Sequence, residues 1–305
     1  MSIKIVQQQI KRFLRSDLPE VMAIKGEWGI GKTFTWNKYL NDYKDEILLD
    51  RYSYVSLFGL NSLEAVKMAI FENAIKRQLI GTSVSLDTFN ENAISVIEKY
   101  ARKATKYIKH NPITKGFSPT LEAFSFLSLN NHIICFDDLE RMGGTLEVKE
   151  VLGLISLLKE QRGCKVVLLL NEEKITSDDF NNYSEKVIDI ELKFDPTSLE
   201  STSIAYEKED WTSETLKRFS NQLNIKNIRL LKKTQRLAES AMSILNDTRQ
   251  EVKEQILKSL VLFSWCHYNS SSDSPSLEYV TNSESRMFSA KKGKTDDEKV
   301  WDNIL

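Results

Sequence analysis

An eight-residue segment near the start of the chain has the residue types and spacing that bind a nucleoside triphosphate. Residues 26–33 read Gly-Glu-Trp-Gly-Ile-Gly-Lys-Thr and complete the pattern G-x-x-x-x-G-K-[ST] directly after an apolar run. In this pattern backbone N–H groups turn around phosphate oxygens, Lys32 reaches the β- and γ-phosphates, and the Thr33 hydroxyl ligates Mg²⁺. A helix that begins at Lys32 adds the positive end of its dipole. The predicted cofactor-binding residues are Gly26, Glu27, Trp28, Gly29, Ile30, Gly31, Lys32 and Thr33.

A second apolar run ends in two carboxylates, as magnesium-dependent phosphoryl transfer requires. Residues 132–136 form this run, and Asp137 and Asp138 follow it. We expect Asp137 to hold Mg²⁺ together with Thr33, and Asp138 to polarise the attacking water as general base, with Glu140 in reserve. The alternative is an Asp pair that caps the following turn or helix, because Asp is common where strands end.

A third apolar run, residues 164–170, ends at Asn171. In P-loop ATPases an asparagine at such a strand end senses the γ-phosphate. The alternative is a simple turn residue, since Asn favours turns in any protein.

Basic residues lie at helical spacing near residue 230, namely Lys226, Arg229, Lys233 and Arg236. Related ATPases have a helical lid that supplies an arginine to the γ-phosphate, and Arg229 is the candidate here. A solvated basic face explains the same four residues.

Together these motifs resemble the KAP family of P-loop NTPases. The resemblance covers residues 3–270 and rests on the phosphate loop with its tryptophan, on residues 54–59 (Tyr-Val-Ser-Leu-Phe-Gly), on residues 137–141 (Asp-Asp-Leu-Glu-Arg) and on the Asn171 strand. Arg141 matches the arginine of the family pattern Asp-Asp-Leu-Asp/Glu-Arg. The relevant branch is similar to bacterial proteins implicated in anti-phage defence. The resemblance therefore implies ATP with Mg²⁺, a role in defence, and room for a phage-derived trigger.

Many members of this family carry transmembrane helices between the two nucleotide motifs, and this chain departs from them. Residues 79–131 contain no run of eighteen apolar residues, so membrane insertion is not expected. Five basic residues within this stretch lie on an expected helix: Lys99, Arg102, Lys103, Lys106 and Lys109. They would contact nucleic acid or anionic lipid, or would form a solvated helix face, so nucleic-acid contact stays open.

The composition is that of a soluble intracellular protein. The 305 residues carry a net charge of −1, so no global attraction to DNA is implied. The three cysteines lack the spacing of a zinc site, and the N-terminus has no cleavable apolar segment. We therefore expect buried, reduced thiols and a cytoplasmic location.

The order of elements predicts an α/β fold, a parallel P-loop NTPase sheet flanked by helices, over residues 1–195. Strands are expected near residues 21–25, 53–58, 132–136, 165–170 and 186–192, with helices between them. Asn61 with Glu64 is expected to open the helix after the second strand, and Gly163 to close the helix before the fourth.

Residues 196–305 are expected to form an all-helical lid region. Thr295 and Glu298 would open a last helix that stops after too few residues to be stable. We therefore expect the helical domain to continue beyond Leu305, with an effector attached.

These observations favour an Mg-dependent ATPase that acts as a nucleotide-driven switch or assembly module. Residues 171–174 lack the Asn-Lys-x-Asp base reader of GTPases, which favours ATP. A scaffold that binds ATP without hydrolysing it would not need the carboxylates, and a nucleic-acid translocase would show an aromatic and basic stripe. No residue of the motifs is an obvious arginine finger in cis. Arg141, Arg229 or a neighbouring subunit of a homo-oligomer would supply one.

Overall fold

The computed structural model describes residues 3–81, 129–175, 178–269 and 274–281. The chain forms two compact units, one of residues 1–27 and 32–195, the other of residues 28–31 and 196–305. The expected basic helix over residues 99–109 and the expected helix start at Thr295 lie outside the described residues.

The first unit is built on a six-stranded sheet in which five strands are parallel. The strand order is β3-β2-β4-β5-β1-β6, and only β3 runs antiparallel to its neighbour. The carboxyl ends of five strands therefore meet at one edge, the usual place for a ligand site in an α/β sheet. The strands are β1 Val21–Lys25, β2 Arg51–Ser56, β3 Ala74–Lys76, β4 His132–Asp137, β5 Lys165–Leu170 and β6 Ile190–Lys193.

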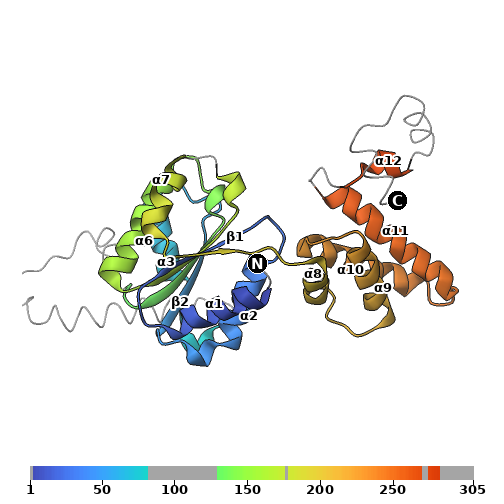
Figure 1. The fold of residues 1–305 in the computed structure, drawn as a ribbon, viewed down its shortest axis with the longest axis horizontal. Helices are drawn as coiled ribbons and strands as arrows, with labels where there is room; N and C mark the ends of the chain where they lie inside the picture. The colour runs from blue at the N-terminus through green and yellow to red at the C-terminus, as the bar shows by residue number, and fades with distance from the viewer. Residues whose placement is uncertain (1–2, 82–128, 176–177, 270–273, 282–305) are drawn as a thin grey trace, which may run out of the picture. The chain divides into compact units, whose positions relative to one another are not determined.

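Helices cover both faces of this sheet (Figure 1), which confirms the predicted α/β class. Every residue of β4 and β5 is buried, as expected for parallel strands enclosed between two helical layers. One layer consists of α1 Ile3–Arg15 and α2 Lys32–Asp42; the other of α3 Leu63–Glu72, α6 Val148–Arg162 and α7 Asp178–Val187. Short 3₁₀ turns lie at η1 Lys44–Glu46, η2 Arg77–Leu79, η3 Leu139–Arg141 and η4 Glu172–Lys174.

The helix boundaries confirm one local prediction and correct another. Gly163 closes α6 with a φ of 62°, as predicted. The predicted N-cap at Asn61 is wrong, because Ser62 caps α3 and its Oγ accepts from the N–H of Ala65 at 3.2 Å. Asn61 instead faces a neighbouring turn, where its carbonyl accepts from Thr145 Oγ1 at 2.7 Å.

Two strands also start at other residues than the sequence predicts. The strand expected over residues 53–58 spans Arg51–Ser56, and the one expected over 186–192 spans Ile190–Lys193, since α7 continues to Val187. The antiparallel edge strand β3 was not predicted, because three residues are too few to show an alternating pattern.

The second unit is helical in all its described segments after residue 196. Its core joins α9, α10 and α11 through buried side chains that include Leu216, Leu231 and Val261. The helices are α8 Ser198–Ala205, α9 Trp211–Gln222, α10 Ile228–Ile244, α11 Gln250–Tyr268 and α12 Leu277–Thr281. Among the described helices of both units, none has the length and apolar character needed to cross a membrane.

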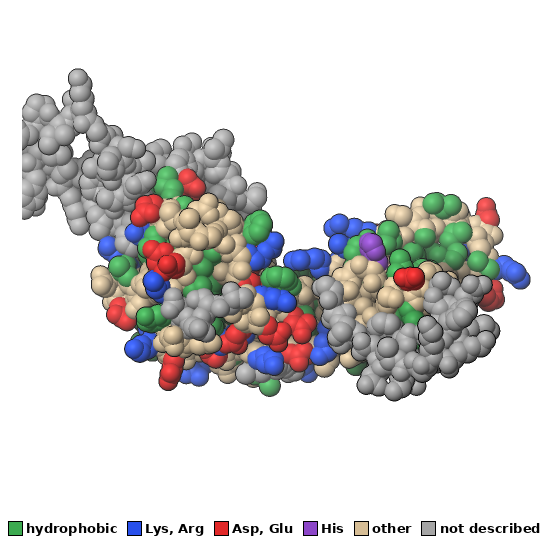
Figure 2. All heavy atoms as spheres, turned by 90° about the horizontal axis from the view of Figure 1, so that it is seen from above, with side chains coloured by type: hydrophobic (Ala, Val, Ile, Leu, Met, Phe, Trp, Pro, Cys, Tyr) green, Lys and Arg blue, Asp and Glu red, His purple; other side chains and the backbone are tan. Residues whose placement is uncertain are grey.

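The surface of the first unit carries charges of both signs. Over the face that Figure 2 shows, acidic and basic side chains are intermixed and do not gather into a surface of one sign. This distribution matches the nearly neutral net charge of the sequence.

Candidate functional site

The phosphate-loop motif lies between the end of β1 and the start of α2. The loop is fixed at its first residue, where the N–H of Gly26 donates to the carbonyl of Leu170 in β5 at 3.1 Å. Gly29 and Gly31 have φ values of 82° and 96°. Residues other than glycine rarely adopt this left-handed backbone conformation. The two glycines therefore suit a tight turn of the backbone.

The two inner glycines also allow a close approach by the start of α10, within the second compact unit. A Cβ atom on Gly29 would lie 2.4 Å from Asn227 Oδ1, and one on Gly31 would lie 2.5 Å from Ile228 Cδ1. Asn227 Nδ2 donates to the carbonyl of Trp28 at 3.4 Å, and the N–H of Arg229 donates to the carbonyl of Gly29 at 3.3 Å. Sequence reasoning missed Asn227 and Ile228, whose distance along the chain from the loop leaves no local signal.

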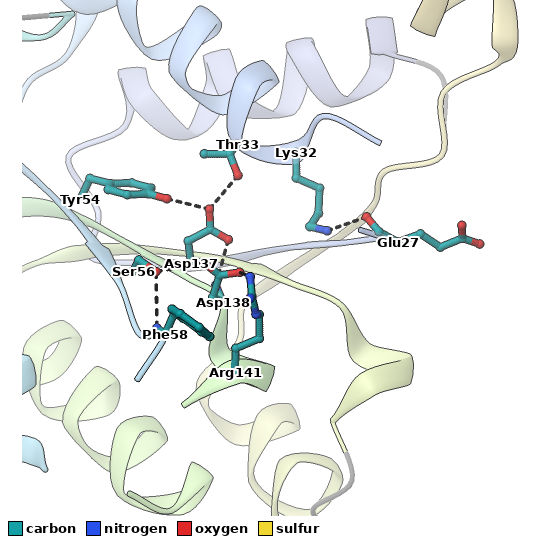
Figure 3. Close-up of polar contacts among 9 residues, drawn as sticks. All are labelled: Glu27, Lys32, Thr33, Tyr54, Ser56, Phe58, Asp137, Asp138 and Arg141. Atoms are coloured by element: carbon teal, nitrogen blue, oxygen red, sulfur yellow. Dashed lines mark hydrogen bonds and ion pairs between the residues drawn. The ribbon is translucent and has the colours of Figure 1, made fainter. Parts of the chain in front are cut away.

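The loop lysine is turned back onto the loop. Lys32 is 8% exposed, and its Nζ donates to the carbonyls of Gly26 at 2.7 Å and Glu27 at 2.8 Å. Figure 3 shows the carboxylate of Glu27 pointing away from Lys32. The loop thus contacts its lysine through main-chain oxygens, and Glu27 contributes its backbone.

The metal ligands predicted from sequence, Thr33 and Asp137, are in direct contact. Thr33 Oγ1 donates to Asp137 Oδ2 at 2.7 Å, and Tyr54 Oη donates to the same oxygen at 2.9 Å (Figure 3). The other oxygen, Oδ1, accepts from the N–H of Asp138 at 2.9 Å. Burial, reinforced by the charge of Asp137, raises the pKa of Tyr54 well above its ordinary value, so the phenol remains a donor.

Asp138 follows the strand in a left-handed conformation, with φ 60° and ψ 38°. Its Oδ2 accepts from Ser56 Oγ at 2.9 Å, and its Oδ1 lies 3.5 Å from Arg141 Nη1. The guanidinium of Arg141 rests over the ring of Phe58, 4.1 Å from the centroid. Glu140, the reserve base, lies between Asp138 and Arg141 in η3.

Asn171 directly follows β5, the strand between β1 and β4, and is 4% exposed. Because these three strands are parallel, Asn171 lies at the same edge of the sheet as the loop and the acidic pair.

A lysine that the sequence did not single out lies at the base of the loop. Lys25 Nζ contacts Glu172 Oε1 at 2.8 Å and Glu191 Oε1 at 3.0 Å. Desolvation lowers the pKa of Lys25, but its hydrogen bonds to these two carboxylates outweigh this effect and leave the pKa above its ordinary value. The charge of Lys25 is therefore balanced by two carboxylates, which indicates a structural role next to the loop.

The predicted lid arginine, Arg229, lies in the first turn of α10, and its side chain is exposed. Within the described part of the chain its guanidinium has neither a hydrogen bond nor an ion pair, whereas its backbone N–H contacts Gly29. Lys233 and Arg236 are also exposed on α10, whereas Lys226 precedes the helix, so the predicted basic face comprises three of the four residues. The γ-phosphate role of Arg229 stays a prediction.

The residues present fit a magnesium nucleotide. A buried lysine, two glycines in the left-handed region and the start of α2 suit phosphate oxygens, while a hydroxyl and a carboxylate in contact suit a hard cation. Among the described residues no three His, Cys, Asp or Glu side chains gather as a metal site.

Comparisons with known proteins agree with this geometry. Residues 8–252 match the model of the KAP family P-loop domain. No curated protein matches the chain.

Several solved structures are similar to this chain at low sequence identity. The Aeropyrum pernix ORC2 protein (ADPNP-ADP complexes) has a TM-score of 0.51 and 14% identity over 83% of this chain, which spans 66% of that one. The A. pernix ORC1 protein in complex with DNA has a TM-score of 0.48 and 13% identity over 86% of this chain and 64% of that one. A Thermotoga maritima RuvB mutant has a TM-score of 0.46 and 12% identity over 97% of this chain and 81% of that one.

Proposed function

The chain belongs to the KAP family of P-loop NTPases, and on that premise we propose that it binds MgATP and hydrolyses it to drive a conformational or assembly switch. The observation that carries this proposal is the contact of Thr33 with Asp137, with Asp138 next in the chain and Lys32 next to Thr33. The ADPNP and ADP complexes of the ORC2 protein, which shares the fold, are consistent with nucleotide binding.

Each loop residue has a role that follows from its atoms. Gly26 anchors the loop through its N–H on Leu170, and the backbone N–H groups of residues 27–31 would surround the phosphates. The Lys32 ammonium would leave its carbonyl partners to neutralise the β- and γ-phosphates. Thr33 Oγ1 and Asp137 would hold Mg²⁺, which when bound neutralises phosphate charge.

Hydrolysis then needs a proton acceptor for water. The water oxygen forms a bond to the γ-phosphorus, the bond from that phosphorus to the β–γ bridging oxygen breaks, and Asp138 takes the water proton. The products are ADP and inorganic phosphate. Asp138 suits this task because it lies beyond the strand end, one residue past the proposed metal ligand. Glu140 is the alternative base.

Three further residues are candidates for contact with the transferring phosphoryl group. We assign Asn171 to sensing the γ-phosphate, because it is buried at the same sheet edge. Arg141 or Arg229 would supply positive charge in the transition state, as would an arginine of a second copy. In this view residues 1–195 form the ATPase domain and residues 196–305 a helical domain.

A second candidate function, nucleotide binding without turnover, is favoured by one observation. Both carboxylate oxygens of Asp138 already have partners, Ser56 on one and Arg141 on the other. If the Arg141 contact persists with nucleotide bound, one side of the carboxylate would stay closed to the attacking water, and the protein would act as a binding switch.

The biological setting is an extension of the same proposal. The resemblance to anti-phage proteins supports a role in bacterial defence, in the cytoplasm, with a phage-derived trigger and a homo-oligomer or attached effector as partners. The likeness to structures of origin-recognition and RuvB proteins concerns the fold alone, so nucleic acid is not assigned as a partner.

Binding and turnover are tested together by calorimetry with MgATP and by release of inorganic phosphate. The wild-type protein should bind and hydrolyse ATP, and Lys32→Ala should lose both, because the phosphates lose their main cationic contact. Lys25→Met serves as the matched control, since Lys25 is compensated by Glu172 and Glu191 and should affect stability more than affinity. Unchanged affinity in Lys32→Ala would show that nucleotide binds elsewhere.

A further inference from the structure

One segment that carries the family resemblance, residues 54–59, has no role in the proposed mechanism so far. Its first residues end β2, the strand beside β4. In the parallel register Tyr54 pairs with Cys135 and Ser56 pairs with Asp137. Because side chains alternate along a strand, Tyr54 and Ser56 project from the same face. Figure 3 shows both side chains directed at the acidic pair.

Tyr54 contacts the proposed metal ligand. Its hydroxyl donates to Asp137 Oδ2 at 2.9 Å, the same oxygen that accepts from Thr33. With the N–H of Asp138 on Oδ1, the carboxylate of Asp137 has three donors that fix both its position and its plane. Removal of the phenol would leave that plane held by fewer contacts.

Ser56 contacts the proposed base. Its Oγ lies 3.4 Å from the N–H of Phe58, from which it accepts, and it donates to Asp138 Oδ2 at 2.9 Å. The backbone N–H thus directs the hydroxyl proton toward Asp138. The opposite oxygen faces Arg141, which rests on the ring of Phe58, so the end of β2 supports both sides of this carboxylate.

We propose that Tyr54 and Ser56 are positioning residues that divide the acidic pair between them: Tyr54 orients Asp137 for the metal, and Ser56 orients Asp138 for the attacking water. This inference rests on the proposed function, because it assigns partners to the carboxylates through which hydrolysis would run. Supporting groups of this kind hold reacting side chains within a fraction of an ångström of the productive geometry.

The division of labour predicts two separable kinetic effects. Tyr54→Phe should raise the Mg²⁺ concentration for half-maximal activity about 10-fold, the usual effect of losing a group that supports a metal ligand, with kcat preserved at saturating Mg²⁺. Ser56→Ala should lower kcat about 10- to 100-fold and leave the Mg²⁺ response and the KM for ATP unchanged, because only the base is displaced. Ser56→Thr keeps the hydroxyl and should recover most of the rate.

Ser53→Ala is the matched control. Ser53 lies on the same strand but on the opposite face, where its hydroxyl donates to the carbonyl of Ile70 at 2.9 Å. This variant removes an equally well-bonded hydroxyl and should change neither kcat nor the Mg²⁺ response. Thermal unfolding of every variant separates a loss of folding from a kinetic effect. If Tyr54→Phe or Ser56→Ala does not fold, Tyr54→His and Ser56→Cys, which retain a weaker or displaced donor, take their place.

The outcomes distinguish a failure of this inference from a failure of the proposed ATPase function on which it rests. If the wild type hydrolyses ATP but Ser56→Ala keeps its full kcat, or Tyr54→Phe lowers kcat without changing the Mg²⁺ response, the division of labour is wrong and the ATPase assignment stands. If the wild type releases no phosphate above Asp138→Asn, hydrolysis and the role of Ser56 both fail. The role of Tyr54 is then decided by the Mg²⁺ dependence of ATP binding in calorimetry.

Discussion

Asp137 and Asp138 are adjacent in the chain, yet their surroundings differ. Asp137 is 7% exposed at the end of β4 and shares one oxygen with a threonine hydroxyl and a phenol. Asp138 is more exposed and adopts a left-handed backbone that a non-glycine residue adopts only at some cost in energy. That conformation turns the second carboxylate to a different set of partners, in keeping with the separate roles proposed for the two residues.

At this scale we predict that Asp138→Asn slows hydrolysis by roughly 10² to 10⁴, the usual contribution of a general base. ATP affinity should change little, since the amide keeps the volume of the side chain and Asn tolerates the left-handed backbone. Phosphate release and calorimetry measure the two effects. Glu140→Gln is the control and should retain its rate; the reverse pattern would make Glu140 the base.

The sequence located the loop, the acidic pair and Asn171, because each follows an apolar run in an order that the motif itself specifies. It did not assign roles to Tyr54 and Ser56, although both lie in a recognised segment. Their partners belong to β4, and the register between two strands is not encoded in either strand alone. Only the folded sheet brings Ser56 level with Asp137.

Among the elements, α10 has a contact that its amphipathic pattern does not reveal. Its cap residue Asn227 accepts from the N–H of Leu230 and also donates to the carbonyl of Trp28. One side chain therefore caps the start of α10 and also contacts the backbone of the phosphate loop. The loop glycine opposite it, Gly29, occupies a variable position of the motif, so the motif alone gives no reason for a glycine there.

We predict that Gly29→Ala destabilises the protein more than Gly59→Ala does. Both glycines have positive φ, 82° and 75°, and either substitution should cost about 1–2 kcal/mol of backbone strain. A Cβ on Gly29 would also collide with Asn227, whereas one on Gly59 meets nothing within 4 Å. The difference in melting temperature between the two variants measures the cost of the collision with Asn227. Gly29→Ala combined with Asn227→Ala should regain part of the lost stability. Equal melting temperatures for the two single variants would argue against the contact.

For the molecule as a whole, the source of transition-state positive charge decides whether one copy suffices. Arg141 is already engaged by Asp138 and the ring of Phe58, and the exposed Arg229 has no side-chain partner in the described part of the chain. An arginine from a second copy would complete the site, and such a residue commonly raises phosphoryl transfer by about 10³ to 10⁵.

We therefore predict that ATPase activity per subunit rises with protein concentration, in step with assembly. Specific activity measured across a dilution series alongside light scattering tests this, and Arg229→Ala mixed with wild-type protein shows whether the arginine acts between copies. A monomer whose activity is independent of concentration and is lost in Arg229→Ala would instead indicate a self-contained site.

The strand order has a consequence for folding while the chain is being synthesised. β1, which leads into the phosphate loop, is flanked by β5 and β6, so its apolar residues Val21–Ile24 gain both neighbours only once Ile190–Lys193 has been synthesised. At the ~5–20 residues per second of translation, this delay lasts about 10 to 30 s. During that interval the nascent chain has at least one edge of β1 without its final neighbour, and exposed strand edges of this kind favour aggregation. The strand that carries the proposed phosphate loop is therefore enclosed on both sides only late in synthesis, when β6 completes the sheet.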